Sequence, residues 1–194
     1  MALLTRAGAI LALGGLLSVA PPIVVGVVGC STAAPDEGAA SPCAGAYLLL
    51  GSFTDEACLA FLEAEQRKLV VTDAAKAPQW VDPKPGKLAA GAPPTFTWSK
   101  GTLAVAPRGV LPAALAHGIT NGDGHVLTFR DSAGKELLRV MTTNLGFAPD
   151  APTWAKVAAA KSITVSLVGA RFSGNVLATG VSPTASPDVA FTVE

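Results

Sequence analysis

The clearest alternation of apolar and polar side chains lies in residues 162–172, SITVSLVGARF. Ile163, Val165 and Leu167 point to one side of an extended chain, and Thr164 and the positions in step with it point to the other, because side chains alternate along a β-strand. β-branched residues occur on both sides, as is typical of a buried strand. We therefore expect the shorter apolar runs around this strand to pack over it and bury it.

Similar but shorter patterns predict the other strands. Alternating apolar residues occur in segments 95–99, 125–130, 137–142, 176–181 and 189–193, and turn-forming residues occur at 121–124 (NGDG) and 131–134 (DSAG). Segments 107–117 and 145–157 read as irregular, the first with a helical turn at 112–116. About six to eight strands with turns between them predict a mainly β fold, an antiparallel β-sandwich over residues 94–194.

Residues 54–70 have the pattern of a helix. Thr54 is a good cap, acidic residues follow it, basic residues stand near the far end, and Glu63 and Arg67 form an i,i+4 pair. Glu65 interrupts a short apolar stripe, which predicts a helix on the surface of the sandwich. The alternative is a helix that docks a partner, and the exposure of Phe61 and Leu62 distinguishes the two. Residues 71–94 are rich in proline and predict an extended linker, with a short edge strand near 69–72.

The first residues have the pattern of an export signal. Residues 7–35 carry no charge, Arg6 precedes them, and an apolar run at 9–20 is followed by small and apolar residues up to Gly29. The sequence Val27-Val28-Gly29-Cys30 resembles the lipobox of bacterial lipoproteins. That resemblance implies cleavage before Cys30, a diacylglyceryl thioether and a further acyl chain on Cys30, and attachment to the cell envelope.

An uncleaved transmembrane anchor is the alternative, since 29 uncharged residues are long enough to span a bilayer. The Pro21-Pro22 pair and the placement of Cys30 favour cleavage. Ser31 resembles the residue found in lipoproteins sorted to the outer membrane, so the outer membrane is the expected location. Residues 1–29 are then the signal peptide, and 30–42 a flexible tether.

The two remaining cysteines, Cys43 and Cys58, lie in a segment that would be exported, where disulfides form. We expect them to pair and to staple the helix within residues 43–93, the segment between the tether and the sandwich. Two buried free thiols or a metal pair are the alternatives.

Three stretches resemble fibronectin type III and related immunoglobulin-like modules of bacterial surface lipoproteins. They are residues 94–98 (PTFTW), the hairpin 126–140 and the closing strand 187–193 (PDVAFTV). The resemblance implies a module that serves as a spacer or binds a protein or a glycan.

Charge and chemistry narrow the function further. Lys and Arg number 14, as do Asp and Glu, and no basic cluster predicts nucleic-acid binding. His117, His125 and Asp123 could form a metal site, but no ligand spacing repeats, so we expect neither metal nor cofactor. The carboxylates Asp131, Glu136, Asp150 and Asp188 show no paired arrangement for glycoside hydrolysis.

Trp80 and Trp154 are predicted outside the strands, as packing residues or as exposed aromatic residues that bind a sugar or a protein. We therefore expect a non-enzymatic, lipid-anchored envelope protein whose β-sandwich is structural or binds a partner. The alternatives are a component of an envelope assembly that docks through helix 54–70, and an envelope enzyme with an unrecognised site.

Overall fold

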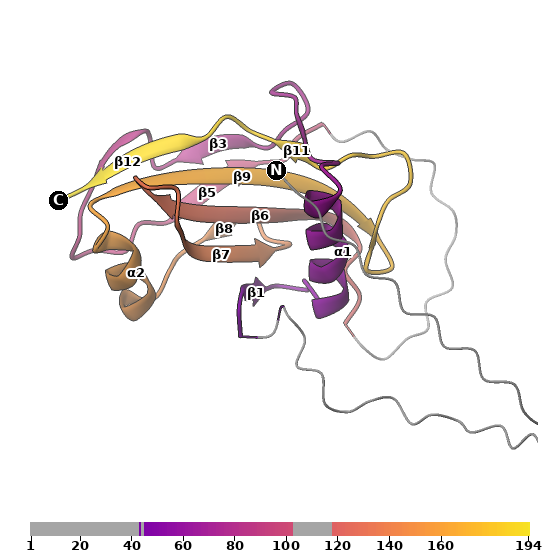
Figure 1. Ribbon diagram of the computed structural model, residues 1–194, viewed down its shortest axis with the longest axis horizontal. Coiled ribbons are helices and arrows are strands. Elements are labelled where there is room, and N and C mark those ends of the chain that lie inside the picture. The colour runs from indigo at the N-terminus through magenta and orange to yellow at the C-terminus, as the bar shows by residue number, and fades with distance from the viewer. Residues whose placement is uncertain (1–42, 44, 103–117) are drawn as a thin grey trace, which may run out of the picture. The chain divides into compact units, whose positions relative to one another are not determined.

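The computed structural model describes residues 43, 45–102 and 118–194, which form a mainly β unit with two sheets and two helices (Figure 1). The strands are β1 (Leu48–Leu50), β2 (Val71–Thr72), β3 (Gln79–Asp82), β4 (Gly86–Leu88), β5 (Phe96–Ser99), β6 (Gly122–Asp131), β7 (Glu136–Thr142), β8 (Gly146–Phe147), β9 (Ser162–Ser173), β10 (Val176–Leu177), β11 (Thr184–Ala185) and β12 (Val189–Val193). The helices are α1 (Asp55–Gln66) and α2 (Ala151–Ala158). The predicted signal peptide and tether, and the expected helical turn at 112–116, lie outside the described residues.

The strand predicted to be central, β9, is central. It pairs with β6 along most of its length, and with β12, β11 and β10 along its other edge. The larger sheet runs in the order β1-β7-β6-β9-β11-β2, and β12 joins β4 to it. The second sheet contains β3, β5 and β8.

Side chains from the two faces of β9 enter two different hydrophobic clusters, as the alternation predicts. Ile163, Val165 and Leu167 pack in a cluster with aromatic residues of the smaller sheet and with α2. Val168 and Phe172 belong to a second cluster, which is built on α1. The larger sheet is therefore covered on one face by the smaller sheet and α2, and on the other by α1.

Gly124 in β6 is required by close packing. A Cβ at this position would lie 2.7 Å from Phe172 and 2.8 Å from Phe53, whose rings meet edge to face at 5.2 Å between centroids. This aromatic pair connects β9 to the turn before α1, so a side chain at Gly124 would displace the helix from the sheet.

The helix prediction is confirmed, with an earlier end. Thr54 caps α1 by accepting a hydrogen bond from the Ala57 amide, and the last turn closes with bonds from Lys68 N to Glu65 O and from Leu69 N to Ala64 O. This is the Schellman pattern, in which the residue after the cap adopts positive φ, and Lys68 does so at 57°. The edge strand expected near 69–72 is β2.

Three sequence predictions are wrong in part. Residues 71–94 contribute β3 and β4 rather than an extended linker alone, because the prolines stand between or at the ends of these short strands. The segment 145–157 contains β8 and α2, with Asp150 as the helix cap. The expected turn at 121–124 lies mostly inside β6, which pairs with β9 from Gly122 onward.

Candidate functional site

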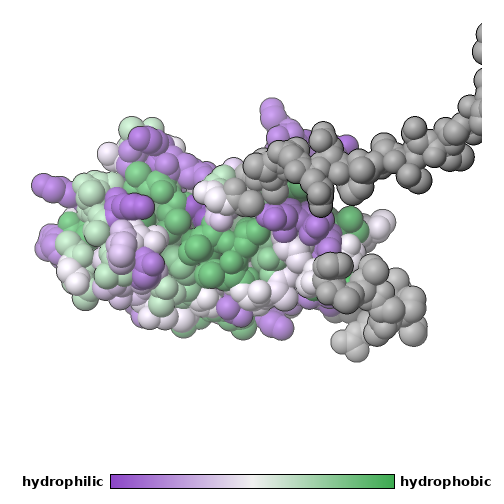
Figure 2. Space-filling model, turned by 90° about the horizontal axis from the view of Figure 1, so that it is seen from below, coloured by the Kyte–Doolittle hydropathy of each residue, from purple (hydrophilic) through white to green (hydrophobic). Residues whose placement is uncertain are grey.

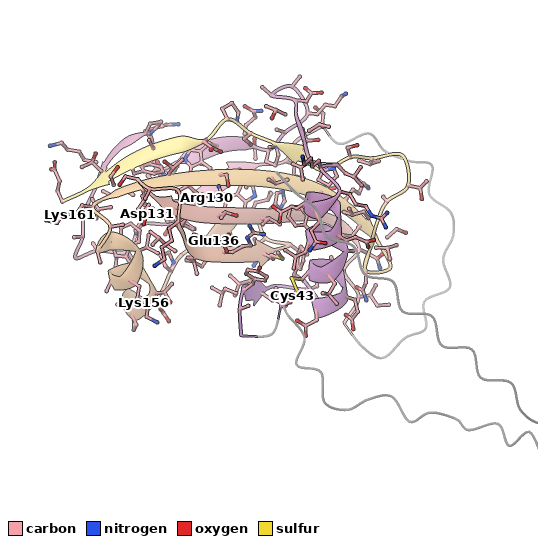
Figure 3. All side chains as sticks on the ribbon, viewed as in Figure 1. Cys43, Arg130, Asp131, Glu136, Lys156 and Lys161 are labelled. Atoms are coloured by element: carbon pink, nitrogen blue, oxygen red, sulfur yellow. A yellow bond between two sulfur atoms is a disulfide. The ribbon has the colours of Figure 1, made fainter. Side chains whose placement is uncertain are left out.

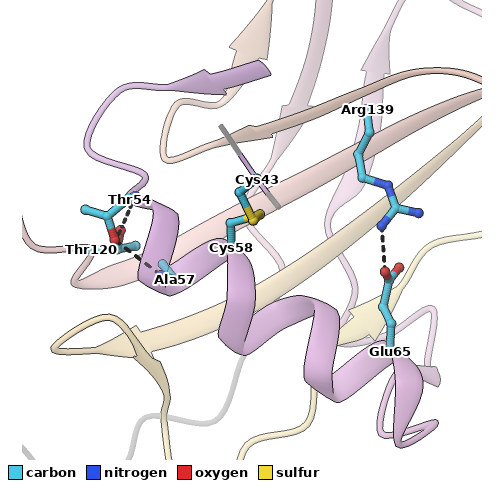
Figure 4. The surroundings of a disulfide bond; sticks show 7 residues. All are labelled: Cys43, Thr54, Ala57, Cys58, Glu65, Thr120 and Arg139. Carbon is cyan, nitrogen blue, oxygen red and sulfur yellow. Dashed lines mark hydrogen bonds and ion pairs between the residues drawn. A yellow bond between two sulfur atoms is a disulfide. The ribbon is translucent and has the colours of Figure 1, made fainter. Parts of the chain in front are cut away.

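The start of the described chain is stapled to α1. Cys43 and Cys58 form a disulfide, with a Cα–Cα separation of 6.3 Å, and both residues are fully buried (Figure 4). Cys58 lies in the first half of α1, and Cys43 stands just before β1. The disulfide expected from the sequence is confirmed. Cys30, the expected lipidation site, lies outside the described residues.

A polar network fixes the beginning of α1. The Thr54 amide donates to the Thr120 hydroxyl at 2.9 Å (Figure 4). The Thr54 hydroxyl donates to Asn175 Oδ1 at 3.0 Å. Asn175 Oδ1 also accepts from the Thr120 amide at 2.6 Å. Three segments far apart in the sequence are therefore joined at the helix cap.

The sheet-facing side of α1 carries a partly buried ion pair. Glu65 accepts a hydrogen bond at 2.6 Å from Arg139 of β7 (Figure 4). Glu136 accepts from the same guanidinium at 2.8 Å. The Arg139 side chain is only 10% exposed, and its guanidinium lies 5.3 Å from the centre of the Tyr47 ring. Glu65, which interrupts the apolar stripe, is therefore a packing residue with a partner. Phe61 is fully buried, and Leu62 is half-buried against the same cluster, as expected for a helix that covers the sandwich.

A trough lined by apolar, polar and charged side chains borders the last turns of α1. It consists of three adjoining hollows of about 230, 330 and 210 Å³. Leu69 and Leu177 line the first two, and residues 180–182 line the last two. Several of the apolar side chains that line the trough are exposed to solvent: Leu69 by 47%, Val71 by 44% and Val176 by 57%. This surface was not predicted from the sequence, although the apolar residues after the Gly174-Asn175 turn could have indicated it.

The aromatic rings of His125 in β6 and Trp98 in β5 form a buried contact between the two sheets. Their ring centroids are 5.6 Å apart, and His125 Nδ1 and Trp98 Nε1 are both buried without a hydrogen-bond partner among the described residues. Burial lowers the pKa of His125 to about 4, so the ring is neutral at neutral pH.

The hypothetical metal site at Asp123, His117 and His125 is not assembled within the described residues. Asp123 pairs with Arg171 at 3.0 Å, and His117 lies outside the described residues. The part of the chain that the structure describes contains no group of three residues suited to hold a metal ion.

Both candidate tryptophans are engaged in packing. Trp154 lies on α2, is 1% exposed, and donates from Nε1 to Ala89 O at 3.1 Å. Trp80 lies in strand β3, not outside the strands as predicted, because it pairs there with Trp98 of β5. Its ring stacks on that of Trp98 at 6.5 Å, and its Nε1 donates to Pro83 O at 2.8 Å. Neither ring forms an open aromatic platform.

Three of the four candidate carboxylates have structural partners, and two of these lie at strand ends, Asp131 in β6 and Glu136 in β7. Asp131 accepts bonds from two amides of its own turn, Asp150 caps α2, and Glu136 binds Arg139. Asp131, Glu136 and Lys156 lie toward the α2 end of the unit, whereas Cys43 lies near α1 (Figure 3). Asp131, Glu136 and Asp150 therefore each have a structural role.

Neither helix of the described chain is both long and apolar enough to cross a bilayer. Comparisons with protein families, with curated protein sequences and with solved structures gave no match.

Proposed function

We propose that this chain is a lipid-anchored protein of the bacterial cell envelope whose β unit acts as a non-catalytic structural or binding module. In this proposal, residues 1–29 are removed, Cys30 carries the lipid, and the outer membrane is the destination. The partner is an envelope protein or a glycan.

The Cys43–Cys58 disulfide is the observation that carries the proposal. Disulfides persist outside the cytosol, where thiols are not kept reduced. Of the three cysteines of the chain, Cys30 is the one outside the disulfide. It stands where the lipobox pattern requires a cysteine. Several acyl chains anchor a protein stably, whereas one binds only marginally.

A Cys30→Ser variant tests the proposal by membrane fractionation and by gel mobility of the precursor. We expect the variant to keep its leader or to leave the membrane fraction, while a Ser31→Ala control remains processed and membrane-bound. Unchanged processing together with unchanged membrane association of Cys30→Ser would reject the lipid anchor.

We further propose that the sandwich belongs to the fibronectin III or immunoglobulin-like class. The inward packing of Phe96 and Trp98, the β6–β7 hairpin and the closing strand β12 support this assignment. The unequal sheets and the parallel pairs β1–β7 and β12–β4 are departures from a simple sandwich of that class. An experimental structure with different neighbours for β6 or β12 would contradict it.

A second candidate function is docking of an envelope partner at the trough beside α1. The exposure of Leu69 and Val176 favours it, because an exposed apolar surface with hollows is typical of interaction sites. In-cell crosslinking tests it: Val176→Asp should abolish a crosslinked partner, and Val81→Asp, at a 45% exposed position of β3, should not. Equal crosslinking in both variants would exclude this site.

A further inference from the structure

The sheet ends on one side in an uncharged leucine strand. Among the described residues, β1 is the outermost strand at this end of the larger sheet, and it pairs with residues 140–142 of β7. Leu48 is 38% exposed, and Leu49 and Leu50 are half-buried. Edge strands are commonly protected by charges, prolines or bulges, yet residues 43–54 contain no charged residue and no proline.

The described part of the chain begins shortly before this edge strand. The described residues begin at Cys43, which is held to α1 by the disulfide and stands five residues before Leu48. Twelve residues separate Cys30 from Cys43, and twelve residues reach at most about 40 Å when fully extended. A lipid on Cys30 would therefore keep β1 close to the bilayer and raise its effective concentration there.

The same face of the molecule is apolar at its centre. Figure 2 views the side that is lowest in Figure 1, where β1 lies, and shows a group of hydrophobic side chains in the middle of that face, with both hydrophilic and hydrophobic ones around it. The whole chain has a formal net charge of zero, so general attraction to an anionic lipid surface is not expected. Contact with a membrane would depend on apolar side chains.

We infer that the β1 edge is the membrane-contacting surface of the protein, with Leu48 inserted among the lipids at the bilayer interface. This inference rests on the proposed lipid anchor. A bilayer fits better than a protein, because a strand of three residues is too small for a stable protein interface, which buries about 1,200 Å² or more. The anchor supplies the affinity that a single apolar contact lacks.

The test uses the full-length chain with a photoreactive diazirine analogue of leucine at position 48, followed by illumination of intact membranes and mass spectrometry of the crosslinks. The matched control carries the same analogue at Val81, which is 45% exposed on β3, across the molecule from β1 (Figure 1). We expect several-fold more crosslinking to phospholipid at position 48 than at position 81.

The possible results of this experiment distinguish a failure of the membrane contact at β1 from a failure of the lipid anchor at Cys30. Membrane-bound protein whose position 48 labels protein, labels nothing, or labels lipid no more than position 81 would overturn the inference and leave the anchor intact. Loss of lipid labelling at position 48 in the Cys30→Ser background would support both. A Cys30→Ser chain that stays processed and membrane-bound would overturn the anchor, and the inference with it.

Discussion

Arg139 and His125 are two buried ionisable residues of this unit, and among the described residues only Arg139 has partners of opposite charge. Arg139 is held by the carboxylates of Glu65 and Glu136, so it is buried as a cation. His125 lies against Trp98 with Nδ1 unpartnered, so it is buried as a neutral ring. A buried charge is tolerated when it is paired, and an unpaired group avoids ionisation instead. The two residues should therefore respond differently to pH and to mutation.

Acid should destabilise the folded protein through His125. The pKa of His125 is about 4 in the folded chain and about 6.5 in the unfolded chain, so only the unfolded state gains a proton between those values. The stabilisation that His125 contributes to the free energy of unfolding is fully present above pH 6.5 and is lost as the pH drops towards 4. The total loss amounts to about 3 kcal/mol. Denaturant titrations at pH 7 and pH 4.5 measure the loss.

A His125→Phe variant should lose less stability than the parent protein over the same pH interval. The variant His117→Gln is the control, and it should retain the full dependence on pH. If the two histidine variants behave alike, His125 is not the responsible group.

Removing Glu65 should cost far more stability than removing Glu63, although both stand on α1. Glu65→Ala leaves Arg139 with one carboxylate in a buried position, which should lower the free energy of unfolding by about 2 kcal/mol. Glu63→Ala removes an exposed pair with Arg67 and should cost less than about 0.5 kcal/mol. Urea denaturation of both variants measures the difference, and equal losses would contradict the buried role of Glu65.

At the level of elements, α1 depends on contacts from outside the helix. Its cap is tied to Thr120 and Asn175, its first half to Cys43, and its last turn to Arg139. A helix of twelve residues is marginal by itself in water. The position of α1 on the sheet, and with it the trough at its end, should therefore depend on these contacts.

Loss of the disulfide should loosen this arrangement. Cys43 and Cys58 are separated by 15 positions, and closing a loop of that length stabilises a fold by about 3 kcal/mol in the chain-entropy model. The double variant Cys43→Ala, Cys58→Ala should unfold at lower denaturant concentration. Hydrogen exchange of the α1 amides should accelerate more than that of the β9 amides, and uniform acceleration would contradict a local role.

The sequence predicted the elements that have regular local patterns. Residues 162–172 alternate cleanly, and Thr54 with its following acids marks a helix start, so β9 and α1 were found. Strands β3 and β4 were missed because each is short and gains its stability from distant partners, namely β5 for β3 and β12 for β4. Local propensity contains no information about such pairings.

The candidate site was predicted less completely than the fold, for a related reason. The pairing of Cys43 with Cys58 follows from counting, because two cysteines remained after Cys30. The Glu65–Arg139 pair joins residues 74 positions apart, and the trough joins α1 to the β10 segment. Contacts of that separation become visible only in three dimensions. Arg139, between the apolar residues Leu138 and Val140, was the available signal for the ion pair, and the apolar residues after the Gly174-Asn175 turn were the signal for the trough.

At the scale of the whole molecule, two contacts are proposed, and they lie at opposite ends of α1. They are the membrane contact of the β1 edge and the partner site at the trough. The disulfide ties the first half of the helix to Cys43 and the β1 edge, and the trough borders the last turns. A chain anchored through Cys30 would then hold the β1 edge at the membrane. The trough, at the other end of the helix, would be left for a partner.

The mass of the mature protein, extracted from membranes and measured intact with its amino-terminal peptide, tests the central claim most directly. The account predicts a chain that begins at Cys30, carries the mass of a diacylglyceryl group and an additional acyl chain, and contains the Cys43–Cys58 disulfide. A chain that retains residues 1–29, or that carries an unmodified Cys30, would contradict it.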